Sequence, residues 1–223
     1  MLSSSTGKLR RHLRVRVLAV LSLLPRRLLA APSAAAMSSS SAAAGSCGVG
    51  APPAGLSSGC VGAPLVPGAK LPIPGDESLM RPKAHGTSAG PVQASLRWGV
   101  DAKLADRICS FNRHYAEHSG YFESVAYLDE VDRAAETTYF DSVTAKPLFV
   151  APRGRSFADF LAESRAHGWP SFRDSEVNWD FVRVLPDGEA VSVDGTHLGH
   201  NLPDRKGNRY CINLVSVAAS AKA

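Results

Sequence analysis

The spacing of apolar residues divides the chain into a helical region and a later region that alternates as strands do. Between Asp101 and His118, apolar side chains recur every three or four residues. They are Leu104, Ile108, Phe111 and Tyr115. This spacing predicts an amphipathic helix that is capped by Asp101 and ends at Ser119-Gly120.

After this helix the period of the apolar pattern shortens toward two, which is typical of strands. The predicted strands are Thr137–Phe140, Pro147–Val150, Phe181–Leu185, Ala190–Val193 and Tyr210–Val217. Residues 186–189, Pro-Asp-Gly-Glu, form a favourable hairpin turn. A second helix of about ten residues is predicted to follow the capping pair Ser156 and Asp159 and to end near His167-Gly168. The pattern therefore predicts an α+β domain with an N-terminal helix and a mainly antiparallel sheet.

The part of the chain before these elements has a different composition. Residues 37–95 are rich in Pro, Gly, Ala and Ser, which bury too little apolar surface to form a core. We expect them to form a disordered low-complexity linker. The folded domain is predicted to begin near Leu96 and to span residues 96–220.

Charge is also distributed unevenly along the 223 residues. Residues 1–75 contain eight Lys and Arg residues and no acid, so the rest of the chain holds 17 basic and 20 acidic residues. The net charge of +5 therefore comes from the N-terminal segment. It does not indicate nucleic-acid binding, because the folded part has a small net negative charge.

Residues 1–36 have the pattern of a targeting presequence. Basic residues precede an apolar run at 17–24 that is too short to span a bilayer, so no membrane span is expected in the mature protein. The Arg- and Ser-rich, acid-free composition favours a mitochondrion or a plastid. A secretory signal and an untargeted tail are the alternatives, and a start at Met37 would leave a cytosolic form.

Two of the four cysteines, Cys47 and Cys60, lie in the low-complexity segment, and the pattern does not indicate a disulfide framework. Cys109 and Cys211 belong to the predicted domain. Strand alternation places Arg209, Cys211 and Asn213 on one face, where the Arg would favour the nucleophilic thiolate. The alternative is a small buried residue of a core strand.

Two further groups of residues could contribute to a site around Cys211. His197 and His200 could relay a proton or bind an oxygen, and could hold a metal only with a further ligand such as Asp194 or His167. Trp169, in the segment 168–172, could form an aromatic pocket wall or anchor a loop in the core. Alternatively, these side chains have only structural roles and form no site.

Three segments together resemble the type B methionine sulfoxide reductases, the peptide-methionine (R)-S-oxide reductases. They are Gly168-Trp169-Pro170-Ser171-Phe172, His197-Leu198-Gly199-His200 and Arg209-Tyr210-Cys211-Ile212-Asn213, in the order and spacing of that family. The resemblance covers about Thr137 to Val217. It implies a small, mainly antiparallel, barrel-like domain of the β-tent, Mss4-like type. It also implies reduction of methionine (R)-sulfoxide in oxidised proteins, a repair activity in oxidative stress.

The resemblance assigns a role to each matched residue. Cys211 is implied as the nucleophile that becomes a sulfenic acid. His197, His200 and Asn213 are implied to stabilise or protonate the sulfoxide oxygen. The residues implied to contact the substrate are Trp169, Phe172 and Arg209. The expected partners are oxidised proteins and thioredoxin or a similar thiol reductant, with no resident cofactor and a monomeric chain.

The sequence departs from the family at two sets of positions. The cysteines of its structural zinc site correspond to Asp141, Thr144, Val191 and Asp194, which indicates the zinc-free branch. The usual resolving cysteine corresponds to His167. Either Cys109 resolves the sulfenic acid or an external thiol reduces Cys211 directly, and the sequence favours direct reduction. Neither the reductant nor the preference for free or protein-bound sulfoxide follows from the sequence.

Two other classes of function fit the same residues. A non-catalytic domain could use Trp169 and the two histidines to bind a peptide or a small ligand. A metal-dependent enzyme could use His197, His200 and Asp194 as ligands.

Overall fold

The computed structural model describes residues 70–221, which form an α+β domain with two antiparallel sheets. The expectations for the presequence, for Met37, Cys47 and Cys60, and for the linker up to residue 69 lie outside the described residues. Within residues 70–221, no helix combines the length and apolar character needed to cross a membrane.

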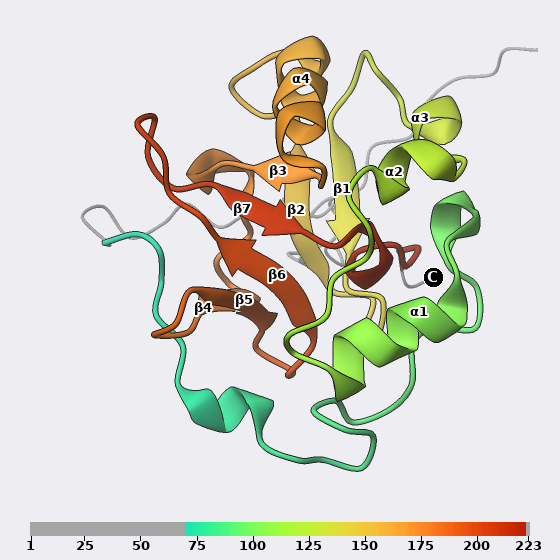
Figure 1. Ribbon diagram of the computed structural model, residues 1–223, viewed down its shortest axis with the longest axis vertical. Helices are drawn as coiled ribbons and strands as arrows, with labels where there is room; N and C mark the ends of the chain where they lie inside the picture. Colours follow the sequence, from blue (N-terminus) through green and yellow to red (C-terminus); the bar gives the residue numbers. More distant parts are fainter. Residues whose placement is uncertain (1–69, 222–223) are drawn as a thin grey trace, which may run out of the picture. The chain divides into compact units, whose positions relative to one another are not determined.

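The larger sheet has five strands in the order β3-β7-β6-β5-β4, and it occupies the centre of Figure 1. Its strands are β3 (Ser171–Phe172), β4 (Val182–Val184), β5 (Glu189–Ser192), β6 (His197–Asn201) and β7 (Tyr210–Ile212). The smaller sheet pairs β1 (Thr137–Phe140) with β2 (Pro147–Ala151), which confirms the first two predicted strands. The predicted hairpin is also present as β4 and β5. Neither sheet of the described residues closes into a barrel.

The second predicted helix is confirmed as α4 (Phe157–His167). The Ser156 hydroxyl accepts the backbone N–H of Asp159 at 3.1 Å and caps the helix. Gly168 ends it in the left-handed conformation, with φ of 87°. A side chain at Gly168 would collide with the Ser119 hydroxyl, since an added Cβ would lie 2.0 Å from it. Gly168 therefore fixes the direction in which the chain enters the Trp169 turn.

The first predicted helix is too long. Its N-cap is confirmed, because Asp101 accepts two backbone N–H groups, but α1 (Ala102–Asp106) and a π-helical turn (Arg107–Phe111) end it well before His118. The predicted apolar stripe is buried only as far as Ile108, and Phe111 is 57% exposed. The residues after Phe111 instead cross toward the larger sheet, where polar contacts hold them. The expected stop at Ser119-Gly120 is the start of a new helix.

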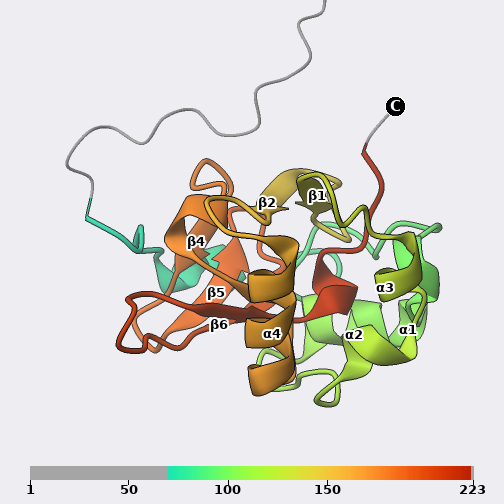
Figure 2. The same ribbon diagram turned by 90° about the horizontal axis from the view of Figure 1, so that it is seen from above.

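Two short helices follow, α2 (Tyr121–Ser124) and α3 (Tyr127–Glu130). Figure 2 shows α1, α2 and α3 together at one end of the domain, with β4 and β5 at the other. The core lies between these ends and is rich in aromatic rings. Phe149 and Phe172 stack with their centroids 4.4 Å apart, and both are fully buried.

The described structure includes residues that precede the domain boundary predicted at Leu96. Residues 73–75 lie along β4, where Gly75 donates to Val184 O at 2.8 Å and Val184 donates to Ile73 O at 3.0 Å, and a 3₁₀ helix (Glu77–Met80) follows. Leu71 and Ile73 also pack against the core. The Pro- and Gly-rich composition excludes long regular elements, but a few apolar residues suffice to dock an irregular segment on an edge strand.

The last strand is shorter than the predicted Tyr210–Val217. β7 ends at Ile212, and a 3₁₀ helix (Leu214–Ser216, η5) follows. Val215 and Val217 are fully buried. Their apolar side chains are therefore explained by packing in the core, although the strand does not continue to them. The turn into η5 places Asn213 at the end of β7, beside the residues described next.

Candidate active site

Strand register brings together residues that are far apart in sequence. Cys211 on β7 lies directly opposite Ser171 on β3 and His200 on β6. Residues opposite each other in antiparallel strands share a face of the sheet. Cys211 and His200 are therefore neighbours although ten residues separate them in the chain.

A bulge in β6 adds His197 to this face. The pairing passes from Ala190 opposite Gly199 to Val191 opposite His197 and skips Leu198. In a regular strand, residues three positions apart point to opposite faces, and one extra residue restores the common face. The centroids of the His197 and His200 rings lie 5.8 Å apart.

Gly199, between the two histidines, is required by the close approach of β7. Its φ is +156°, and a Cβ at this position would lie 2.1 Å from the carbonyl oxygen of Cys211. A larger residue would push β6 away from β7 and separate His200 from Cys211. This segment, which no pattern in the sequence assigned to an element, forms strand β6.

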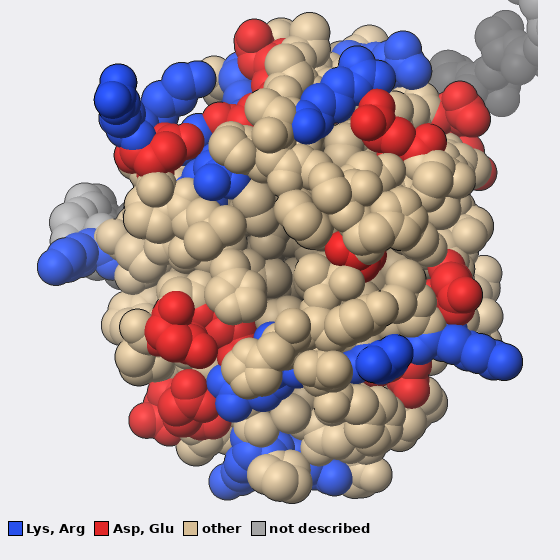
Figure 3. Space-filling model, in the orientation of Figure 1, with Lys and Arg blue, Asp and Glu red and all other residues tan. Residues whose placement is uncertain are grey.

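Five of the predicted site residues line one cavity of about 310 Å³. They are Cys211, His197, His200, Asn213 and Trp169. Residues 114–116, Gly199 and Leu202 complete the wall. Figure 3, in the orientation of Figure 1, shows a hollow in uncharged surface at the centre of this face, with charged groups around it. Phe172 is not part of the cavity, because it is fully buried in the aromatic core.

Cys211 is partly exposed, and a guanidinium contacts its sulfur. Arg209 Nη1 lies 2.6 Å from Cys211 Sγ. Burial raises the pKa of the Cys211 thiol, and the positive charge of Arg209 opposes that rise. Arg209 thus contacts the thiol. It does not line the cavity, although the resemblance implies that it contacts the substrate.

His197 is held from behind by Glu189, a buried carboxylate that the sequence did not single out. Nδ1 of His197 lies 2.6 Å from Oε1 of Glu189. Burial raises the pKa of Glu189, but hydrogen bonds from His197 and Arg113 outweigh this effect and leave it below its usual range. An ionised carboxylate accepts the Nδ1–H, so the Nε2 atom is the one left to act in the cavity.

The surroundings of His200 disfavour the charged form of its ring. Burial lowers its pKa, and the neighbouring His197 lowers it further. A neutral ring at this position can donate or accept one hydrogen bond in the cavity without carrying a charge.

Trp169 and Asn213 are both held by Glu117. Trp169 Nε1 donates to the Glu117 carbonyl at 3.2 Å, and the Glu117 N–H donates to Asn213 Oδ1 at 3.2 Å. Asn213 Nδ2 also donates to Leu198 O at 3.1 Å. No local pattern indicated a site role for Glu117 or Glu189, because one was assigned to a helix and the other to a hairpin turn.

Cys109 lies away from the cavity. It is fully buried, and its Sγ–H donates to Ser216 Oγ at 3.6 Å. Burial raises the pKa of this thiol strongly. The residue that aligns with the usual resolving cysteine, His167, lines a different groove.

The ligand set that the sequence suggested for a metal is not assembled. Asp194 forms an ion pair with Lys146 at 2.8 Å and does not line the cavity. Among residues 70–221, no group of three or more His, Cys, Asp or Glu side chains is arranged to hold a metal ion.

Polar contacts link two loops of this chain. These loops contain the positions that, by the resemblance, correspond to zinc-binding cysteines in other proteins. Both oxygens of buried Asp141 lie 3.0 Å from Thr196 Oγ1, and Lys146 reaches across to Asp194. The loop after β1 and the turn after β5 are therefore held together by a neutral hydroxyl, a carboxylate and an ion pair.

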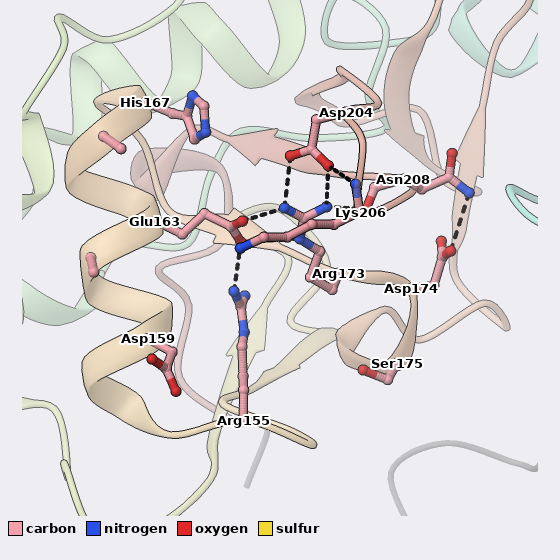
Figure 4. A pocket seen from close by; sticks show the side chains of 12 residues that line it. Arg155, Asp159, Glu163, His167, Arg173, Asp174, Ser175, Asp204, Lys206 and Asn208 are labelled. Atoms are coloured by element: carbon pink, nitrogen blue, oxygen red, sulfur yellow. Dashed lines mark hydrogen bonds and ion pairs between the residues drawn. The ribbon is translucent and has the colours of Figure 1, made fainter.

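A second, larger groove runs beside α4. Its charged side chains alternate in sign from Arg155 through Glu163 and Arg173 to Asp204, and Figure 4 shows them joined by hydrogen bonds and ion pairs. Asn208 donates to Asp174 in the same groove. These four charges are engaged with one another and form a paired ionic surface.

No protein-family model matches this chain. The site is therefore defined by its own geometry. One thiol, two imidazoles, one amide and one indole from three segments share a single cavity.

Proposed function

We propose that this protein is a thiol-dependent peptide-methionine (R)-S-oxide reductase that repairs oxidised proteins. The observation that carries the proposal is the shared cavity of Cys211, His197, His200, Asn213 and Trp169. The open five-stranded sheet beside a two-stranded hairpin is consistent with a zinc-free domain of the β-tent, Mss4-like type. The Asp141–Thr196 and Lys146–Asp194 contacts would hold together the two loops that zinc joins in other members of that family.

The proposed reaction transfers one oxygen and two electrons. Cys211, as the thiolate, attacks the sulfoxide sulfur while the cavity histidines protonate the sulfoxide oxygen. The transient bond between the two sulfurs and the S–O bond of the substrate then both break, the protonated oxygen becomes bonded to Cys211 as a sulfenic acid, and methionine leaves as the thioether. The methionine sulfur is reduced by two electrons, and the cysteine sulfur is oxidised by two.

Each cavity residue supplies something that this step needs. His197, whose Nδ1–H is held by Glu189, donates a proton from Nε2 when its ring is doubly protonated, and Asn213 offers an amide to the oxygen. The indole of Trp169 provides an apolar surface for the methyl group. Arg209 stabilises the thiolate at 2.6 Å.

Regeneration is proposed to use an external thiol reductant such as thioredoxin. Two thiol equivalents convert the sulfenic acid to the thiol and water and become a disulfide. Cys109 is fully buried and hydrogen-bonded to Ser216, and His167 stands at the usual resolving position, so direct reduction of Cys211 is the simpler route. The N-terminal segment would deliver the chain to a mitochondrion or a plastid.

The test is an epimer-resolved assay on the full chain with dithiothreitol as the reductant. The parent protein should reduce the R epimer of a methionine sulfoxide peptide and leave the S epimer. Cys211→Ser should abolish turnover without loss of the folded state by circular dichroism. Equal activity of the variant and the parent would contradict the assignment of the nucleophile.

A non-catalytic peptide-binding domain is the second candidate. The net rise of the Cys211 pKa favours the neutral thiol, which is the less reactive form. In that case neither epimer would be turned over, and a methionine sulfoxide peptide would bind the parent and Cys211→Ser equally well by calorimetry.

A further inference from the structure

One irregular segment contacts residues on both sides of the cavity. We call residues 112–117 the strap; it leaves the π-helical turn that follows α1 and runs beside β6 toward α2 in Figure 1. Residues 114–116 of the strap line the cavity. Tyr115 is 39% exposed, so apolar burial contributes little to holding this part of the chain in place.

Arg113 anchors the first half of the strap. Its guanidinium reaches Oε2 of Glu189 through Nε at 2.9 Å and Nη2 at 2.5 Å. The other oxygen of Glu189 accepts from His197. A single buried carboxylate therefore joins the strap to the imidazole, with Arg113 on one oxygen and His197 on the other.

Glu117 anchors the second half. It is 2% exposed, and its two carboxylate oxygens accept the backbone N–H groups of Leu214 and Val215 at 2.8 and 3.1 Å. These bonds hold Glu117 against the first turn of η5. Its backbone is then in place to accept from Trp169 and to donate to Asn213.

A buried carboxylate is costly unless its hydrogen bonds are satisfied, so Glu117 has a strong preference for this one arrangement. Burial raises its pKa to about 7, although the two backbone N–H groups favour the charged form. The strap is thus held at each end by a carboxylate with defined partners.

We propose that the strap positions the active site, with Arg113 orienting His197 through Glu189 and Glu117 orienting Trp169 and Asn213. This inference rests on the proposed reductase function. Neither Arg113 nor the Glu117 carboxylate touches the reacting atoms, so both are positioning residues. The two anchors act on different groups and should have different kinetic signatures.

The experiment measures kcat and KM of the full chain for a methionine (R)-sulfoxide peptide with dithiothreitol. Arg113→Met should lower kcat about tenfold, because a poorly oriented general acid loses part of its contribution to the rate. KM should change less than twofold. Arg113→Lys, which keeps the charge, should recover most of kcat. Glu117→Gln should raise KM about fivefold because it loosens the Trp169 wall, and Glu117→Ala should raise it further.

Arg165→Gln is the matched control, because it removes an exposed ion pair with Glu123 outside the cavity. It should leave kcat and KM unchanged. The melting temperature of each variant separates mispositioning from unfolding. Folded Arg113→Met and Glu117→Gln proteins with parental kcat and KM would overturn the proposal. An equal loss of kcat in both, with no KM change and no rescue by Arg113→Lys, would also overturn it.

The parent protein distinguishes this failure from failure of the proposed function. If the parent has no turnover with either epimer, the reductase assignment fails and the strap proposal fails with it. If the parent is active and the variants match it, only the strap proposal fails.

Discussion

The surroundings of the two described cysteines differ in almost every respect that controls thiol chemistry. Cys211 borders a cavity, touches Arg209 and faces two imidazoles, whereas Cys109 is fully buried with Ser216 as its hydrogen-bond partner. Burial raises the pKa of both thiols, but only Cys211 has a neighbouring cation that opposes the rise. Proximity in the fold, and not the cysteine itself, therefore distinguishes a proposed nucleophile from a core residue.

The same contrast applies to the two hollows in the surface. The groove beside α4 has more charge, but its carboxylates and guanidiniums pair with one another. The polar residues of the cavity are held from behind by Glu189 and Glu117 and keep other atoms for the cavity. Polar groups are available for chemistry when their supporting bonds lie on the side away from the ligand.

The largest effect among tests of this comparison is expected for Glu189→Gln. The amide no longer provides the negative charge that accepts the Nδ1–H of His197 and favours the doubly protonated ring that donates from Nε2, so kcat should fall roughly 10- to 100-fold. Steady-state kinetics with dithiothreitol would measure it. Glu136→Gln, at an exposed ion pair with Arg153, is a matched control that should behave as the parent. Unchanged kcat in Glu189→Gln would show that His197 orientation does not limit the reaction.

A smaller effect is expected for Trp169→Ala. Loss of the aromatic wall should weaken sulfoxide binding by about 1 kcal/mol beyond the lost burial, which is about fivefold in KM. Trp179→Phe, a conservative change in the core, serves as a control for a general effect of altering a tryptophan. An unchanged KM in Trp169→Ala would remove the indole from the substrate site.

The smallest effect is expected for Cys109→Ser. If an external thiol reduces Cys211 directly, thioredoxin-coupled turnover should stay within about twofold of the parent, because a buried thiol takes no part in exchange. Cys47→Ser and Cys60→Ser extend the test to the N-terminal segment. Loss of thioredoxin-coupled turnover with dithiothreitol activity retained would identify Cys109 as the resolving thiol and break the comparison.

Local patterns predicted several elements correctly. The capped helix after Ser156 and the β1–β2 and β4–β5 strand pairs follow from short-range rules of capping, alternation and turn chemistry. The first helix was overextended because its periodicity continues past Phe111, although the chain must leave the helix for Arg113 and Glu117 to reach the sheet. The resemblance implied a substrate contact for Phe172, but alternation on β3 directs its side chain into the core.

The sequence by itself determined which residue types were present and which segments were able to form strands and helices. It pointed to Cys211, His197, His200, Asn213 and Trp169, and all five line one cavity. Tertiary structure alone decided how they meet. The bulge at Leu198 turns His197 to the face of His200, and carboxylates 72 residues apart, Glu117 and Glu189, support opposite sides of the cavity. Such contacts depend on strand register and chain crossing, which are long-range properties that no local pattern encodes.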